Sequence, residues 1–317
     1  MNNCPNCAAE LIPGAKFCHR CGDKVVEKTK ACPACQQSNP LASVFCHHCG
    51  FHFEGKQRPP SAYVPHFPLD FDPETITEQV KAMFFRSLRG RVEEEHDPQQ
   101  YSDYVERFYH SKFREVYAVR ARQIAEEAMA QWKRFGTEAL PEIDAKIGMA
   151  FEGLLDYFTI QFCPDLNGIL LPETILKYER VSPGETDSWR MIQDFLDIDH
   201  EDEIFYLNFI AMPQEYMANA CKQYLMAQGR EKVYFICDLS LKGNCKEGFA
   251  MTDRALYWRA PFDKARQVAY SDLREIVKGK DWLTINGHFF TANPSLNLKL
   301  YKLLKKMRGW RPAAVPV

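Results

Sequence analysis

Apolar residues in the long middle part of the chain recur at the three- and four-residue spacing of an amphipathic helix. Val80, Met83, Phe84 and Leu88 lie on one face of the first such stretch, which begins just after Pro73. Further stretches with helical character follow at 101–135, 143–162, 188–196 and 214–228. The pattern predicts an all-α region over residues 74–228, in which the apolar run 204–212 fits either a strand or a buried helix.

From Lys232 onward the apolar period becomes two, which is the period of a β-strand. Asn286-Gly287 between two alternating runs indicates a tight hairpin, and Pro294 opens a final helix with leucines along one face. The expected strands are Val233–Ser240, Gly248–Thr252, Ala255–Ala260, Arg266–Tyr270, Arg274–Lys278, Trp282–Asn286 and His288–Ala292. Short antiparallel strands followed by an amphipathic helix predict a small, bent β-barrel over 229–310, capped by that helix.

Two segments of this β region resemble the pleckstrin-homology-like (PH-like) domains of bacteria. The segment 248–254 with the following Leu256-Tyr257-Trp258 is similar to their core hairpin. The segments 282–287 and 293–295 are similar to the end of such a domain. The resemblance implies a PH-like scaffold that binds lipid headgroups, peptides or other subunits, and it brings no catalytic residues.

Eight of the twelve cysteines lie within the first fifty residues, as four Cys-x-x-Cys pairs. Each cysteine of the second copy stands twenty-eight residues after its counterpart, and ten residues separate the two pairs of each copy. The pairs are Cys4 with Cys7, Cys18 with Cys21, Cys32 with Cys35, and Cys46 with Cys49. Residues 1–54 therefore form an internal repeat. A Pro-rich linker follows over 55–73, because closely spaced prolines favour extended chain over helix.

This cysteine spacing is typical of a tetrahedral zinc site with four thiolate ligands. Each tight turn brings two thiolates together, and two turns at the ends of a short hairpin complete the shell. We predict two structural Zn²⁺ ions, one held by the first four of these eight cysteines and one by the last four. Their binding is expected to fold residues 1–54, which we call the head. Free or disulfide-bonded thiols, an Fe–S cluster, and ligation by His19, His47 or His48 are the alternatives. A closed shell leaves no position for a reactive water, so we expect the metal not to be catalytic.

The repeat closely resembles the double zinc ribbon (DZANK-type) family over residues 1–52. The matching positions are the eight cysteines, Phe17 before the second pair, and Gly22 and Gly50 after the closing pairs. Ala8 and Gln36 stand where the family often has glycine, so we expect slight strain in the first turn of each copy. The resemblance implies zinc binding and a role in docking proteins or nucleic acid.

Outside the head, each candidate site has a structural alternative. We interpret the acids of Glu93–His96 and Asp194–Glu203 as solvated helix ends and loops rather than as a di-iron or acid–base site. The basic residues of segment 299–311 could contact anionic lipid or nucleic acid. Alternatively, they are simply the outer face of the helix that caps the barrel, where lysines interact favourably with the C-terminal helix dipole. Cys237 and Cys245 could form a redox pair, although buried inert thiols fit better. The sequence contains no phosphate-binding loop, dinucleotide motif or nucleophile motif.

Composition narrows the remaining choices. The net charge of −2 gives no bulk attraction to polyanions. The sequence shows neither an N-terminal apolar leader nor an apolar run long enough to cross a bilayer, so we expect a cytoplasmic protein with reduced thiols. We predict a multidomain α+β protein of bacterial type that acts as a zinc-binding adaptor or regulator of protein–protein interactions, is not an enzyme and has no small-molecule substrate. Nucleic-acid binding through the ribbons and recruitment to an anionic membrane surface through the PH-like domain are the alternatives.

Overall fold

The chain folds into two compact units, Met1–Val64 and Pro65–Val317, in a computed structural model. The structure describes residues 66–179, 181, 186–227, 229 and 231–308 of the second unit, and residues 7, 9, 18, 20, 21, 29–32 and 37–40 of the first. In the described part of the first unit, β1 (Thr29–Ala31) pairs antiparallel with β2 (Ser38–Pro40). Directly after β1, the backbone N–H of Cys32 donates to the carbonyl of Gln37 at 2.9 Å.

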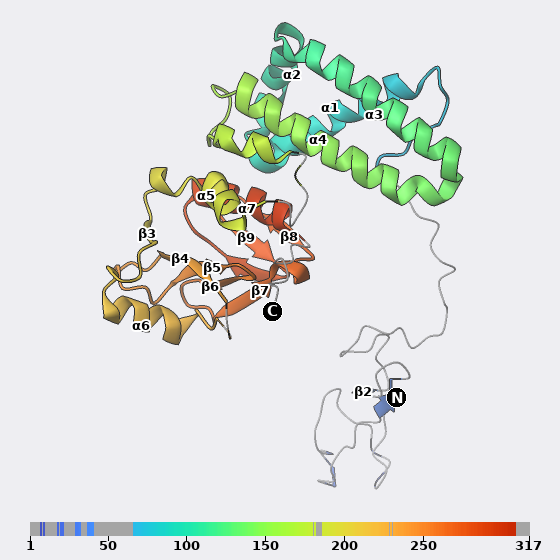
Figure 1. The fold of residues 1–317 in the computed structure, drawn as a ribbon. Coiled ribbons are helices and arrows are strands. Elements are labelled where there is room, and N and C mark those ends of the chain that lie inside the picture. Colours follow the sequence, from blue (N-terminus) through green and yellow to red (C-terminus); the bar gives the residue numbers. More distant parts are fainter. Residues whose placement is uncertain are drawn as a thin grey trace, which may run out of the picture. The chain divides into compact units, whose positions relative to one another are not determined.

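The first part of the second unit is helical, as the apolar spacing predicts (Figure 1). Its helices are α1 (Ile76–Glu95), α2 (Tyr101–His110), α3 (Phe113–Phe135) and α4 (Leu140–Phe162), with 3-10 turns η1 (Pro98–Gln100) and η2 (Gly136–Ala139). Phe84 of α1 is fully buried, and its ring contacts those of Phe108, Phe113 and Phe151. The stretch predicted as one helix over 101–135 is divided at Ser111, which has an extended backbone.

Residues 66–71 pack against these helices. The carboxylate of Asp144 accepts the backbone N–H groups of His66 and Phe67 at 3.0 and 2.6 Å, and the ring of Phe71 stacks on Trp132 at 4.2 Å. The end of the segment that the sequence assigns to a Pro-rich linker is therefore part of the packed second unit.

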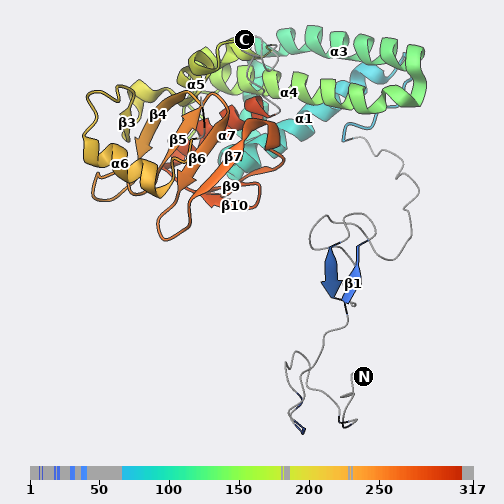
Figure 2. The ribbon, with the colours of Figure 1, turned by 60° about the horizontal axis from the view of Figure 1, so that its bottom comes forward.

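The rest of the second unit contains two antiparallel sheets (Figure 2). The larger has the order β3-β4-β5-β6-β7 and the smaller β10-β9-β8. The strands are β3 (Ile204–Tyr206), β4 (Val233–Asp238), β5 (Gly248–Thr252), β6 (Ala255–Arg259), β7 (Arg266–Ala269), β8 (Ile276–Lys278), β9 (Leu283–Ile285) and β10 (His288–Phe290). Every strand expected after Lys232 is present, and the ambiguous run 204–212 contributes the edge strand β3. Asn286 and Gly287 both have positive φ (48° and 79°), as a tight two-residue hairpin turn requires.

Helices cover both faces of the larger sheet, which explains why β5 and β6 are buried at every position except the half-buried Arg259. On one face, Phe249 and Trp258 share a core with α7 (Pro294–Met307), α5 (Ser188–Leu196) and η3 (Glu173–Tyr178). On the other, Ala250 and Tyr257 pack against α6 (Gln214–Gln223) and the residues after it. The remaining 3-10 turns are η4 (Ile198–His200) and η5 (Tyr270–Asp272).

The strands between residues 231 and 308 do not form the closed barrel that the sequence pattern predicts. The turn η5 stands between β7 and β8, so the hydrogen-bond ladder of the larger sheet does not continue into the smaller one. The two sheets are instead joined by a common core, in which Trp258 of β6 donates its indole N–H to the carbonyl of Phe289 at 2.8 Å. The fold is thus a mixed helix and sheet architecture with a helical middle. No helix in the described ranges is both long and apolar enough to cross a bilayer.

Candidate metal centre

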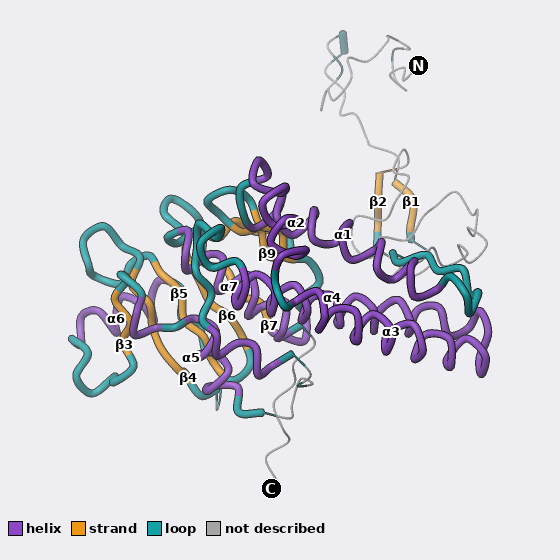
Figure 3. Tube along the Cα trace, turned by 90° about the horizontal axis from the view of Figure 1, so that it is seen from above, coloured by secondary structure: helices purple, strands orange, loops and turns teal. Residues whose placement is uncertain are grey.

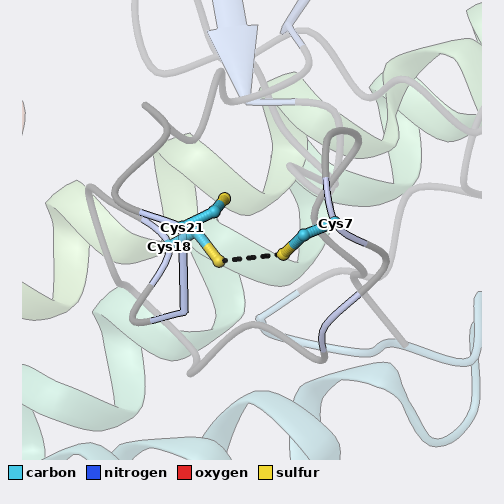
Figure 4. Close-up of side chains that lie close together, drawn as sticks. All are labelled: Cys7, Cys18 and Cys21. Carbon is cyan, nitrogen blue, oxygen red and sulfur yellow. Dashed lines mark hydrogen bonds between the residues drawn. The ribbon is translucent and has the colours of Figure 1, made fainter.

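Three of the predicted zinc ligands converge in the first unit. The Sγ atoms of Cys7, Cys18 and Cys21 all lie within 4.8 Å of one another, and Figure 4 shows the side chains of Cys7 and Cys18 directed at each other. Cys18 is buried, Cys7 is half-buried and Cys21 is exposed. Among the residues that the structure describes, these three cysteines are the cysteine, histidine or acidic side chains that lie close enough together to hold a metal ion.

The sulfur geometry fits zinc. Four sulfurs at about 2.3 Å from a tetrahedral zinc ion lie roughly 3.8 Å apart, and the Sγ atoms of Cys7 and Cys18 are 3.7 Å apart. A disulfide would need about 2.05 Å. The pair is therefore spaced as two ligands of one ion, and the thiolate set present is the one that zinc prefers in structural sites.

The local backbone favours the thiolate form of Cys18. The backbone N–H of Arg20 donates to its Sγ at 3.4 Å, and this contact, followed by that of the Cys21 N–H, lowers the pKa of Cys18 to about 6. Metal ligation requires a deprotonated sulfur. The tight turn thus supplies the charge stabilisation expected of the Cys-x-x-Cys motif.

The other predicted ligands are only partly described. Cys32 is buried, with 1% of its surface exposed, directly after β1. Cys4, Cys35, Cys46 and Cys49 lie outside the described residues, as do Phe17, His19, Gly22, His47, His48 and Gly50. The structure therefore shows three cysteines of the first copy brought together, and one cysteine of the second copy buried directly after β1.

Acids and bases that the sequence places on solvated surfaces are partly buried in the second unit. Arg91 and Glu95 of α1 contact each other, and Lys302 of α7 lies 2.8 Å from Glu95 and 2.7 Å from Asp156 of α4. Their side chains join α1, α4 and α7 in a buried ion cluster, in which Arg91, Glu95 and Lys302 are almost fully buried, Asp156 is half-buried, and Glu152 and Lys305 are partly exposed. The acidic end of α1 therefore makes structural contacts. The neighbouring His96 is a neutral base, because burial lowers its pKa to about 4.

The acidic run 194–203 is likewise engaged in packing. Lys299 of α7 lies 2.5 Å from Glu201 and 3.4 Å from Asp197. The N-cap of α7, Asn293, donates its side-chain amide to Glu201 at 3.1 Å. Lys299 thus pairs with carboxylates of this run, rather than contributing to the open cationic face that the sequence allows.

Cys237 and Cys245 are both fully buried and are not joined in a disulfide. Burial raises the pKa of both thiols, to about 12 for Cys245 and far above the ordinary value for Cys237. Neither thiol is reactive at neutral pH, which agrees with the inert interpretation.

Sequence reasoning missed the buried ion cluster, although one signal was present. Arg91 and Glu95 fall three and seven residues after Leu88, on the same face as the apolar positions of α1. Charged residues on the core face of a helix indicate buried partners elsewhere in the chain. The partners themselves come from positions more than sixty residues away.

Comparison with known proteins supports the metal centre. Residues 4–50 match the double zinc ribbon family, and this match implies zinc binding. Among curated proteins and solved structures, none matches the chain significantly.

Proposed function

We propose that the protein is an adaptor whose tandem zinc ribbons, held by two structural Zn²⁺ ions, dock a protein partner. The observation that carries the proposal is the convergence of Cys7, Cys18 and Cys21, with the first two sulfurs at the separation expected of ligands on one zinc ion. The twenty-eight-residue repeat supplies the same residues a second time.

The chemistry of the site favours docking over catalysis. A shell of four thiolates leaves no open position for water or substrate, so the metal would act by folding the head. The head is also a compact unit of its own. A small zinc-folded unit joined to a larger body can present a binding surface while the body makes other contacts, which is the property required of an adaptor. Accordingly, we propose no enzymatic activity for the metal centre.

The metal content of the purified chain tests the first part. We expect two zinc ions per chain by elemental analysis. The variant Cys4→Ser/Cys7→Ser/Cys32→Ser/Cys35→Ser should lose both ions, whereas Cys221→Ser, an exposed cysteine of α6, should keep them. Iron in place of zinc, or a chain with no bound metal, would contradict the proposal.

Affinity purification with the same variants tests the docking role. Protein partners should be retained by the intact chain and by Cys221→Ser, and lost from the four-serine variant. If the retained material is instead nucleic acid that dissociates as the salt concentration rises, the ribbons are nucleic-acid readers. Partners retained equally by the four-serine variant would show that the ribbons do not dock them.

A second candidate function, recruitment to an anionic membrane surface by a PH-like C-terminal region, is favoured by two loops of the larger sheet. Asp238, Gly248, Arg259 and the neighbouring β7 residue Arg266 lie at the same end of the sheet, because these residues end or begin the paired strands β4 to β7. The β4–β5 and β6–β7 loops therefore leave the sheet at one edge.

Each of these loops carries a fully exposed apolar side chain, Leu241 in one and Phe262 in the other. Exposed lysines lie beside them at Lys242 and Lys264. Apolar loop tips flanked by cations suit the interface of an anionic bilayer, where each lysine near the surface contributes about 1 kcal/mol.

Co-sedimentation with vesicles of phosphatidylserine and phosphatidylcholine tests this second function. We expect the full chain to sediment with these vesicles. The double variant Leu241→Ser/Phe262→Ser should lose most of this binding. The matched control is Leu170→Ser, which replaces an exposed leucine elsewhere in the second unit. Equal sedimentation of all three proteins would exclude the loops as the membrane contact.

A further inference from the structure

A cavity of about 1350 Å³ opens between the α3–α4 helix pair and the segment formed by η3, α5 and α7. Figure 3 shows α3 and α4 running side by side, with α7 beside α4. Side-chain contacts agree, since Lys302 and Lys305 of α7 reach carboxylates of α4. The volume exceeds the roughly 300–1000 Å³ of ordinary small-molecule pockets, so it has room for an extended ligand.

Much of the cavity wall is apolar and open to solvent. Val119 of α3 and Met149 of α4 line it with 55% and 64% of their surfaces exposed. Ile175, Leu176 and Phe195, which are more buried, line it from η3 and α5. Exposed apolar side chains gathered on a concave surface are characteristic of a binding site for an apolar group.

Most charged side chains of the wall neutralise one another. Arg120 pairs with Glu179 at 2.7 Å, and Lys305 pairs with Glu152 at 2.8 Å. Lys302 is held by Asp156 and by Glu95 behind the wall. These cations are already satisfied and offer little attraction to a ligand anion.

Lys306 differs from them. Its Nζ donates to the backbone carbonyl of Glu179 at 3.3 Å, and no carboxylate among the described residues lies within 4 Å of it. The residue is half-buried, and burial lowers its pKa. Arg308, which directly follows α7 and is exposed, also lines the cavity. Glu126 and Glu127 also line it, but both are exposed, so water and salt weaken their repulsion of an anion.

From this arrangement we infer that the cavity binds an amphiphilic anion, with an alkyl chain against the wall of α3 and α4 and a carboxylate or phosphate head on Lys306. A purely apolar ligand would leave the half-buried ammonium without an anionic partner. A small inorganic anion would leave the apolar wall exposed. An alkyl chain with one anionic head satisfies both features.

Titration calorimetry of the full chain tests the inference with four probes: octanoate, decanoate, decyl phosphate and decanol. Burial of two further methylene groups should make decanoate bind about fifteenfold more tightly than octanoate. A charge-assisted contact at Lys306 should make decanoate bind at least about tenfold more tightly than decanol. The tighter of decanoate and decyl phosphate identifies the head group as a carboxylate or a phosphate.

Two variants separate the head contact from the wall contact. Lys306→Met should weaken decanoate binding to the level of decanol and leave decanol binding unchanged. Met149→Glu, at an exposed position, should weaken both ligands. The matched control is Lys222→Met, at an exposed lysine of α6, which should weaken neither. An unchanged thermal unfolding temperature shows that each variant remains folded.

The inference is wrong if decanoate fails to bind at its solubility limit, or if affinity does not depend on chain length. It is equally wrong if Lys306→Met binds decanoate as tightly as the unaltered chain does. Because none of these measurements involves the metal centre, the inference and the proposed adaptor function fail independently.

Discussion

Replacing Lys302 with methionine should strongly destabilise the second unit. Lys302 of α7 belongs to the buried ion cluster, with 3% of its side chain exposed, and it contacts Glu95 and Asp156. The cluster as a whole is neutral, because three cations (Arg91, Lys302 and Lys305) face three carboxylates. Lys302→Met leaves one carboxylate of the interior uncompensated.

The expected cost follows from burial. Removing one partner of a buried ion pair costs about 3–5 kcal/mol, since the remaining charge stays out of water. For a unit of this size, each kcal/mol corresponds to roughly 2–4 °C, so the unfolding temperature should fall by about 6–20 °C. Lys305→Met is the control. Its pair with Glu152 is partly exposed (30% and 45%), so its loss should cost under about 1 kcal/mol.

The effect should also depend on pH. Burial would raise the pKa of Asp156, but the charges of Lys302 and Arg91 outweigh it and lower that pKa. A depressed carboxylate pKa stabilises the fold above the unfolded value near 3.8, and the contribution disappears as the pH falls towards the folded value. The difference between the unaltered chain and Lys302→Met should therefore be full at pH 7 and shrink below about pH 4.

Urea unfolding, followed by tryptophan fluorescence at pH 7, measures the difference. Adding Glu95→Gln to Lys302→Met removes the uncompensated negative charge and should restore part of the lost stability. The reasoning fails if Lys302→Met and Lys305→Met are equally stable, or if Glu95→Gln destabilises the variant further.

Four further predictions concern single residues and the metal centre. Because burial depresses the pKa of His96 to about 4, the stability of the unaltered chain should fall by on the order of 3 kcal/mol between pH 6.5 and pH 4. His96→Phe should abolish this loss, and a parallel pH profile for the variant would refute the assignment. Gly248→Ala should cost more than about 2 kcal/mol in urea unfolding, because its φ is +155° and a Cβ would lie 2.2 Å from the carbonyl oxygen of Cys237. Gly90→Ala in α1 meets no atom within 4 Å and should stabilise the fold by up to about 1 kcal/mol. Removing zinc with a chelator should abolish the dispersed NMR signals of residues 1–64 and leave the unfolding temperature of the second unit unchanged; a shift of that temperature would show that the units are coupled.

Local patterns were sufficient to predict most of the helices and strands of the second unit. The alternation after Lys232 gave each of the strands β4 to β10, and Asn286-Gly287 gave the β9–β10 turn. The division of the predicted helix at Ser111 was not visible, because the residues around it keep the apolar spacing of one continuous face. The separation into two sheets was also missed, since strand order depends on pairings between distant residues that no local period encodes.

The metal centre and the cavity also differ in how far the sequence predicts them. Cys7, Cys18 and Cys21 lie within fifteen residues of the chain in a repeated pattern, so spacing alone predicts that they share a ligand set. The cavity is assembled from helices more than a hundred residues apart in the sequence, and no motif marks it. The sequence accordingly indicated a metal site and no small-molecule site.

The lysines of α7 show how folding changes a functional interpretation. In the sequence they form a basic face suited to lipid or nucleic acid, but Lys299 and Lys302 are ion-paired and nearly buried in the structure. A polyanion that displaced their partners would leave carboxylates such as Glu201 uncompensated in the interior, at a cost of several kcal/mol. The exposed loop lysines carry no such cost, and Lys306 faces the cavity. Contacts with anions should therefore be sought at the sheet edge and in the cavity, where binding leaves the internal ion pairs intact.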